Sequence, residues 1–96
     1  MSNHNTPKHQ DLEIGDVKEF VTGKKTFVAE VSGRLNEELI LDPLFDHEVE
    51  EYAIFNNGTV WESRYPSGDQ IESEEEDLGK LQEINPTEDE SVTSNY

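Results

Sequence analysis

The residues of this chain that could do chemistry gather around one histidine. His47 lies among Asp46, Glu48, Glu50 and Glu51. A carboxylate beside an imidazole can form a general-base pair, and an imidazole with carboxylates can bind a metal ion. A lone histidine among acids on a short element is more often simply solvated. We therefore predict no catalytic site, no metal site and no bound cofactor, and we expect that the protein is not an enzyme.

Other signatures of reactive sites are missing from the sequence. It has no nucleophile elbow, no glycine-rich phosphate loop and no paired metal-binding histidines. The stretch "SGDQIESEEED" does not fit a calcium-binding EF-hand loop, because Gly68 precedes its acids. The chain contains no cysteine, which excludes disulfides and thiolate metal sites.

The charge balance restricts the partners. Seven basic residues face 23 acidic ones, for a net charge of -16. Direct binding to nucleic acid needs a basic footprint, and an anionic membrane would repel the chain, so we expect neither. A basic protein surface, including that of a nucleic-acid-binding protein, would attract it in a salt-dependent way. The alternative is that the charge only keeps the protein soluble.

Carboxylates on ordered elements suit partner binding better than carboxylates on a tail. Ordered charges present a fixed pattern, whereas a flexible tail loses entropy when it binds. Exposed aromatic side chains often anchor interfaces. The candidate partner-binding residues are Glu48, Glu50, Glu51, Glu62, Trp61 and Tyr65.

The elements that must position these residues lie in one part of the chain. Apolar residues cluster between Leu12 and Tyr65 and are sparse elsewhere. We predict a disordered arm over residues 1–11, a folded core domain over residues 12–66, and an acidic, largely disordered tail over residues 67–96. A core of this size is near the lower limit for independent folding, so oligomerisation or a partner could add stability.

Local patterns predict an α+β, mostly β fold. Residues 17–22, 26–32 and 38–41 have the composition of strands. Asp42 followed by Pro43 is typical of a helix start, which indicates a helix of one to two turns. We expect a small antiparallel sheet of four to five short strands with one short helix and disordered termini.

The most specific local signal is a hairpin around "NNG". Aromatic and β-branched residues flank Asn56, Asn57 and Gly58 on both sides. Asn-Gly is the preferred pair for a type I′ turn, in which both central residues need positive φ. We predict that Asn57 and Gly58 form such a turn.

The segment after Pro66 has two interpretations. Ile71, Leu78, Leu81 and Ile84 have spacings that fit one face of a helix. The apolar stripe is thin and interrupted by a glycine, so we favour a solvated tail that becomes helical only on a partner.

Two resemblances bear on function. The composition is similar to that of phage- or mobile-element-encoded acidic DNA mimics and inhibitors. Residues 42–71 resemble the end of a family of small uncharacterised bacterial proteins with a D-P-x-x-F step, a tryptophan and a G-D ending. The matching residues are Asp42, Pro43, Phe45, Trp61, Gly68 and Asp69, although Phe45 comes one place early and "ESRYP" intervenes before Gly68. This resemblance implies a small α+β fold and a regulatory, non-enzymatic role.

Together these patterns indicate a small acidic binding protein. We expect it to inhibit or regulate a partner protein by engaging its basic surface, with mimicry of DNA as one version. The alternative is a structural or assembly adaptor whose acidic tail folds on a partner. The absence of an apolar leader or a membrane-spanning run predicts a cytoplasmic, intracellular location.

Overall fold

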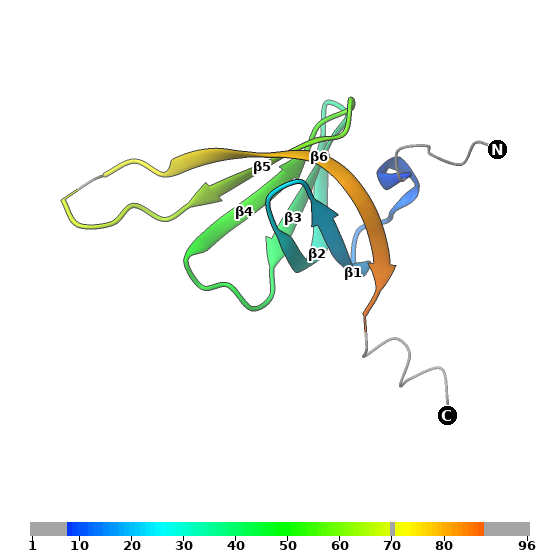
Figure 1. The fold of residues 1–96 in the computed structure, drawn as a ribbon, viewed down its shortest axis with the longest axis horizontal. Coiled ribbons are helices and arrows are strands. Elements are labelled where there is room, and N and C mark those ends of the chain that lie inside the picture. Colours follow the sequence, from blue (N-terminus) through cyan, green and yellow to red (C-terminus); the bar gives the residue numbers. More distant parts are fainter. Residues whose placement is uncertain (1–7, 70, 88–96) are drawn as a thin grey trace.

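Six antiparallel strands form a closed barrel in the computed structural model, which describes residues 8–69 and 71–87 (Figure 1). The strands are β1 (Val17–Thr22), β2 (Thr26–Leu35), β3 (Glu38–Pro43), β4 (Val49–Ile54), β5 (Thr59–Arg64) and β6 (Glu74–Pro86). Each strand pairs with the next one in the chain, and β6 closes the barrel on β1. Within the described residues, closure gives each strand a partner strand on both sides.

The barrel interior follows from alternation along the strands. In β2, Phe27, Ala29 and Val31 are buried, while the residues between them are partly exposed. The Phe27 ring stacks on the Tyr52 ring with 3.6 Å between centroids. The buried apolar core consists of Phe20, Phe27, Ala29, Val31, Leu39, Leu41, Val49, Tyr52, Ile54, Val60, Leu78 and Leu81.

The predicted fold class was wrong in strand number and in the helix. The sheet has six strands and is closed, and the sixth strand comes from the segment predicted to be a tail. Leu78, Leu81 and Ile84 have helix-like spacing because β6 is irregular. The pairing skips Leu78 opposite β5 and Gln82 opposite β1, as β-bulges do. These bulges let side chains three residues apart face the interior.

The predicted helix after Asp42 is a turn. Asp42 lies in β3 and pairs with Glu30 of β2, and β3 ends at Pro43. Asp46 then organises the loop of residues 44–48. Its side chain accepts a hydrogen bond from the Glu48 N–H, and its carbonyl accepts one from the Val49 N–H. An aspartate side chain that accepts from the N–H two residues further on stabilises a turn, and this bond competes with helix formation.

The chain before β1 covers one end of the barrel. A single 3₁₀ turn, η1 (His9–Asp11), leads into β1, and the His9 side chain is buried. Arg34 donates to the carbonyls of Gln10 and Leu12 over 3.2 Å. Part of the predicted arm is therefore packed, while residues 1–7 and 88–96 of the predicted disordered ends lie outside the described residues. No helix in the described part of the chain is long and apolar enough to cross a membrane.

The β4–β5 hairpin lies where the sequence predicts it, with another turn type. The Gly58 N–H donates to the Phe55 carbonyl, and the Phe55 N–H donates to the Thr59 carbonyl. Gly58 has a φ of 92°, but Asn57 does not have positive φ. The loop is therefore a turn over residues 55–58 followed by a glycine bulge, which is the common three-residue hairpin.

A type I′ pattern occurs instead in the β2–β3 hairpin. Asn36 and Glu37 have φ values of 52° and 76°, between the paired residues Leu35 and Glu38.

The positive φ of Glu37 predicts a stabilising substitution. Glutamate has a Cβ that opposes this conformation, whereas glycine has none. We expect Glu37→Gly to raise the free energy of unfolding by about 0.5 to 1 kcal/mol in denaturant titrations. Glu37→Ala removes the same charge and keeps the Cβ, so an equal gain in both variants would contradict a conformational cause.

Candidate functional site: an acidic outer face

The residues predicted to bind a partner separate into an interior and an exterior set. Glu62 points into the barrel, and its side chain is only 2% exposed. Glu48, Glu50 and Tyr65 are exposed, and Glu51 and Trp61 are half-buried on the outside. Glu62 is therefore inaccessible from the outside of the barrel, whereas the other five side chains reach the outer surface.

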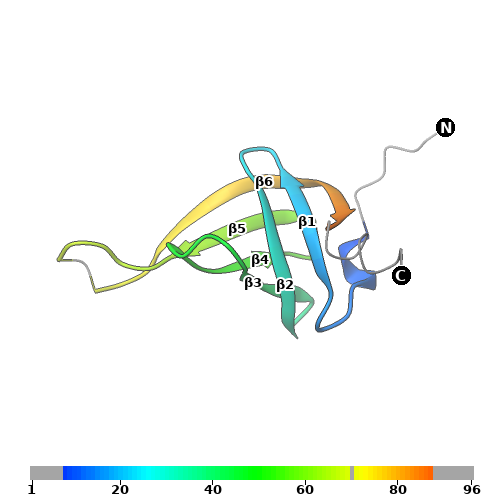
Figure 2. The same ribbon diagram turned by 90° about the horizontal axis from the view of Figure 1, so that it is seen from below.

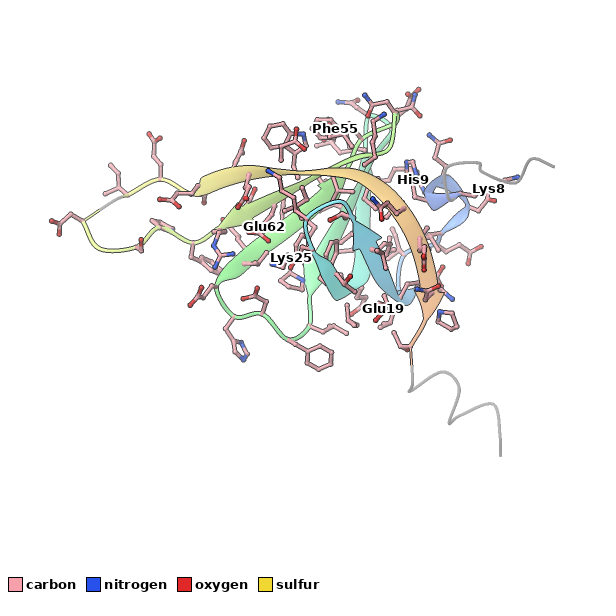
Figure 3. The ribbon with its side chains drawn as sticks, viewed as in Figure 1. Lys8, His9, Glu19, Lys25, Phe55 and Glu62 are labelled. Atoms are coloured by element: carbon pink, nitrogen blue, oxygen red, sulfur yellow. The ribbon has the colours of Figure 1, made fainter. Side chains whose placement is uncertain are left out.

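Glu62 is held by two cations at one end of the barrel. Its carboxylate accepts from Lys25 Nζ at 2.5 Å and from Arg64 Nη1 at 2.8 Å. Figure 3 labels Glu62 and Lys25. Lys25 also contacts Asp46 Oδ2 at 3.1 Å and lies 5.3 Å from the centre of the Tyr52 ring. We call Lys25, Asp46, Glu62 and Arg64 the mouth cluster.

The contacts within the mouth cluster favour the charged forms of Lys25 and Asp46. Burial would lower the pKa of Lys25, but the hydrogen bonds to Glu62 and then Asp46 outweigh it, so this pKa is raised. The Glu48 N–H, followed by Lys25, lowers the pKa of Asp46. Lys25 and Asp46 therefore remain charged at neutral pH, and the cluster ties the β1–β2 turn, β5 and the loop of residues 44–48 together.

The outward face of the sheet carries a row of carboxylates. Glu30 of β2 pairs with Asp42 of β3. Glu51 of β4 pairs with Ser63 of β5, which in turn pairs with Glu75 of β6. Neighbouring strands are about 4.8 Å apart, so such a row is dense in charge. We call Glu30, Asp42, Glu50, Glu51 and Glu75 the acidic face.

The charges of the acidic face repel one another. Burial, and then the charges of Glu50, Asp42 and Glu75, raise the pKa of Glu51. Like charges that face each other across strands are destabilising. Glu50 is partly compensated, because it accepts a hydrogen bond from the Ser73 hydroxyl at 2.8 Å.

Aromatic side chains border the acidic face. Trp61 of β5 pairs with Ala53 of β4 on one side and with Asp77 of β6 on the other. Its ring stacks on the Phe55 ring with 6.2 Å between the ring centroids. Tyr65 is 54% exposed. It lines a shallow pocket of about 350 Å³ together with Asp42 and Glu50. Acids and aromatic groups therefore occur together on the outer surface.

The loop that joins β5 to β6 extends this surface. Residues 65–69 and 71–73 reach away from the barrel in both views (Figures 1 and 2). Ile71 in this loop is 89% exposed. At its base, Arg64 donates to Glu48 Oε1 at 2.5 Å, so Glu48 is paired although it is 78% exposed.

Repulsion at Glu51 has a measurable consequence. Because the folded state raises the pKa of this carboxyl, its charged form opposes folding above that pKa, and the cost disappears as the pH falls below the unfolded value. We expect Glu51→Gln to stabilise the protein by about 0.5 kcal/mol at pH 7 and to have no effect near pH 3.5, in thermal unfolding at both pH values. A loss of stability at pH 7 would contradict the repulsion. Glu13→Gln, in the exposed segment before β1, is the control.

Comparison with protein-family models gave no match, and neither curated proteins nor solved structures gave a significant one. The two resemblances noted in the sequence therefore stay predictions, and the α+β fold that one of them implied is wrong. Within residues 8–69 and 71–87, no group of three or more histidine and acidic side chains is arranged to hold a metal ion.

Proposed function

We propose that this protein is a non-enzymatic inhibitor or regulator that engages the basic surface of a partner protein through its acidic face. The supporting observation is the register that places carboxylates side by side on neighbouring strands, with Glu30 opposite Asp42 and with Glu51 and Glu75 on either side of Ser63. Burial, and then the neighbouring carboxylates, raise the pKa of Glu51. Lysine and arginine side chains of a partner would relieve this repulsion. The strand framework fixes the positions of the charges, so little backbone conformational entropy of this protein is lost when the complex forms.

The partner class follows from the charge pattern. A net charge of -16 steers association with basic proteins and repels nucleic acid. Nucleic-acid-binding proteins carry such basic surfaces, so mimicry of DNA is one version of the proposal. In that version the acidic face occupies the surface of the partner that would otherwise bind DNA phosphates. The protein would then act inside the cell. The adaptor alternative has less support, because residues 74–86 of the proposed folding tail already form β6.

The proposal is tested with two variants of equal charge. One carries Asp42→Asn, Glu51→Gln and Glu75→Gln on the acidic face. The other carries Glu13→Gln, Glu37→Gln and Glu83→Gln at exposed positions elsewhere. Each is used as bait in extracts of the native host, and the captured proteins are quantified by mass spectrometry.

We expect basic proteins to be captured by the wild type and by the control variant, and to be lost with the acidic-face variant. Affinity for a purified partner should fall at least tenfold, which equals about 1.4 kcal/mol. Equal loss in both variants would mean that net charge alone drives binding, and the proposed site would be wrong.

A further inference from the structure

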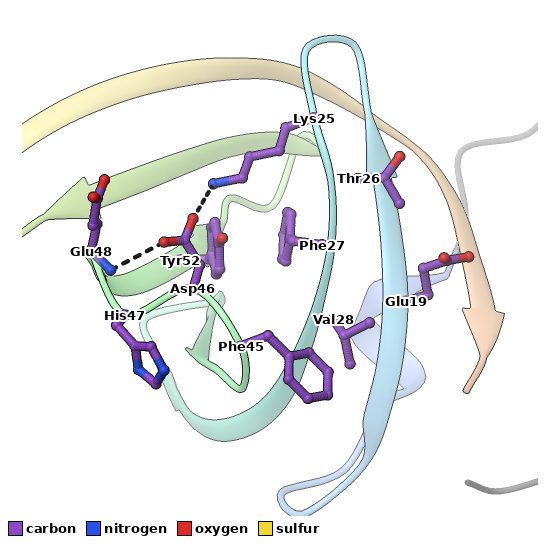
Figure 4. A pocket seen from close by; sticks show the side chains of 10 residues that line it. All are labelled: Glu19, Lys25, Thr26, Phe27, Val28, Phe45, Asp46, His47, Glu48 and Tyr52. Carbon is purple, nitrogen blue, oxygen red and sulfur yellow. Dashed lines mark hydrogen bonds and ion pairs between the residues drawn. The ribbon is translucent and has the colours of Figure 1, made fainter. Parts of the chain in front are cut away.

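A groove opens at the end of the barrel that carries the mouth cluster (Figure 4). It lies between the β1–β2 hairpin and the loop of residues 44–48, and its volume is about 680 Å³. The stacked rings of Phe27 and Tyr52 line it, with Phe45 on one side and Glu19 and Glu48 also at its border. We call this the mouth groove.

The mouth groove continues onto an apolar surface. A second hollow of about 460 Å³ shares Glu19, Val28 and Phe45 with it. This hollow is also lined by Val17, Leu44 and Pro86. Phe45 is 72% exposed and Leu44 is 39% exposed, so two adjacent large apolar side chains face solvent here. Exposed apolar surface of this kind marks binding sites.

The charges that line the mouth groove are mainly negative. Glu19, Asp46 and Glu48 contribute carboxylates, and Lys25 contributes one ammonium. Lys25 is already engaged by Glu62 and Asp46, and Glu48 is engaged by Arg64, so the carboxylates around the groove outnumber the cations that pair with them. An anionic ligand would therefore be repelled by these carboxylates. A cationic ligand would be attracted by the carboxylates at the rim and would lie over the aromatic rings beneath them.

We infer that the mouth groove binds an arginine or lysine side chain of a partner protein, with the partner's neighbouring apolar residues on the surface formed by Val28, Leu44 and Phe45. This inference rests on the proposed function, because both require a basic partner. A guanidinium can stack on the exposed Phe45 ring while it donates hydrogen bonds to a carboxylate. The apolar stem of the same side chain fits against Phe27 and Val28.

The test uses two capped tetrapeptides, Val-Leu-Arg-Val and its counterpart with citrulline in place of arginine. Citrulline keeps the shape and removes the charge. Each is titrated into the ¹⁵N-labelled protein, and amide shifts are followed by NMR. We expect the arginine peptide to shift residues 26–28 and 44–48, with at least tenfold weaker binding of the citrulline peptide, since hydrogen bonds to charged groups are the stronger ones. Equal affinities of the two peptides would overturn the inference.

Two alanine variants locate the site. Phe45→Ala removes the exposed ring and should weaken arginine-peptide binding about fivefold or more. Leu35→Ala removes a side chain that is 61% exposed in the β2–β3 hairpin and should leave the affinity unchanged. Arginine-peptide shifts only at residues 51, 63 and 75 would overturn the groove and retain the acidic face. No shift at either surface would overturn both.

Discussion

Replacing Lys25 with methionine is expected to lower the free energy of unfolding by about 3 kcal/mol. The change leaves the Glu62 carboxylate, which is 2% exposed, with Arg64 as its remaining cation. A buried charge that loses a partner keeps its desolvation cost without the compensating attraction. The contact between Lys25 and Asp46 is lost as well. Urea unfolding, followed by circular dichroism, measures the difference.

Lys24→Met is the matched control. Lys24 is the adjacent residue, carries the same charge and is exposed, so its replacement should change stability by less than about 0.5 kcal/mol. In the background of Glu62→Gln, Lys25→Met should cost less than it does alone, because the buried anion is gone. Equal losses for the two lysine variants would show that the mouth cluster does not stabilise the barrel.

Gly58→Val is expected to cost about 2 kcal/mol. Gly58 is buried and has a φ of 92°, a conformation that a β-branched residue resists. Its carbonyl also accepts from the Leu81 N–H at 2.8 Å, so a shift of this backbone would disturb β6. Thermal or urea unfolding would detect the loss.

Gly33→Val provides the comparison for Gly58. Gly33 lies in β2 and lacks positive φ, and a Cβ added at this position would meet no other atom within 4 Å. Valine suits a strand, so this change should be neutral or stabilising. If both glycine variants lost the same stability, the turn conformation would not explain the effect at Gly58.

Local features of the fold could be predicted from the sequence. Alternation in residues 26–32 indicated the inner face of β2, and Asn-Gly indicated the position of the β4–β5 hairpin and the positive φ of Gly58. Both signals depend on residues near one another in the chain. The turn type was wrong because the local pattern does not distinguish a two-residue loop from a three-residue loop with a bulge.

β6 could not be recognised from its own residues. Its first four residues are acidic, and its bulges at Leu78 and Gln82 replace the strand period with helix-like spacing. Its pairing with β1 joins segments more than 50 residues apart, and no local pattern encodes that closure. The strand is defined by its neighbours on both sides.

Glu62 is a residue for which two sequence signals disagree. Alternation places Val60 and Trp61 on opposite faces, and the same rule puts Glu62 on the inner face with Val60. A glutamate is rarely buried without a partner, and this rule predicts that the Glu62 side chain lies on the surface. Its partners Lys25 and Arg64 come from different parts of the chain, and only the closed barrel brings Lys25 to it.

The central claim is that the acidic face contacts a basic partner, and carboxylate-to-lysine cross-linking tests it most directly. A zero-length carbodiimide reagent joins a carboxylate to a lysine only where the two are in contact. The wild-type protein is cross-linked to the partner captured from its native host, and the linked peptides are identified by mass spectrometry. We predict that links concentrate on Asp42, Glu50, Glu51 and Glu75. Links spread equally over the exposed control residues Glu13, Glu37 and Glu83 would contradict the account.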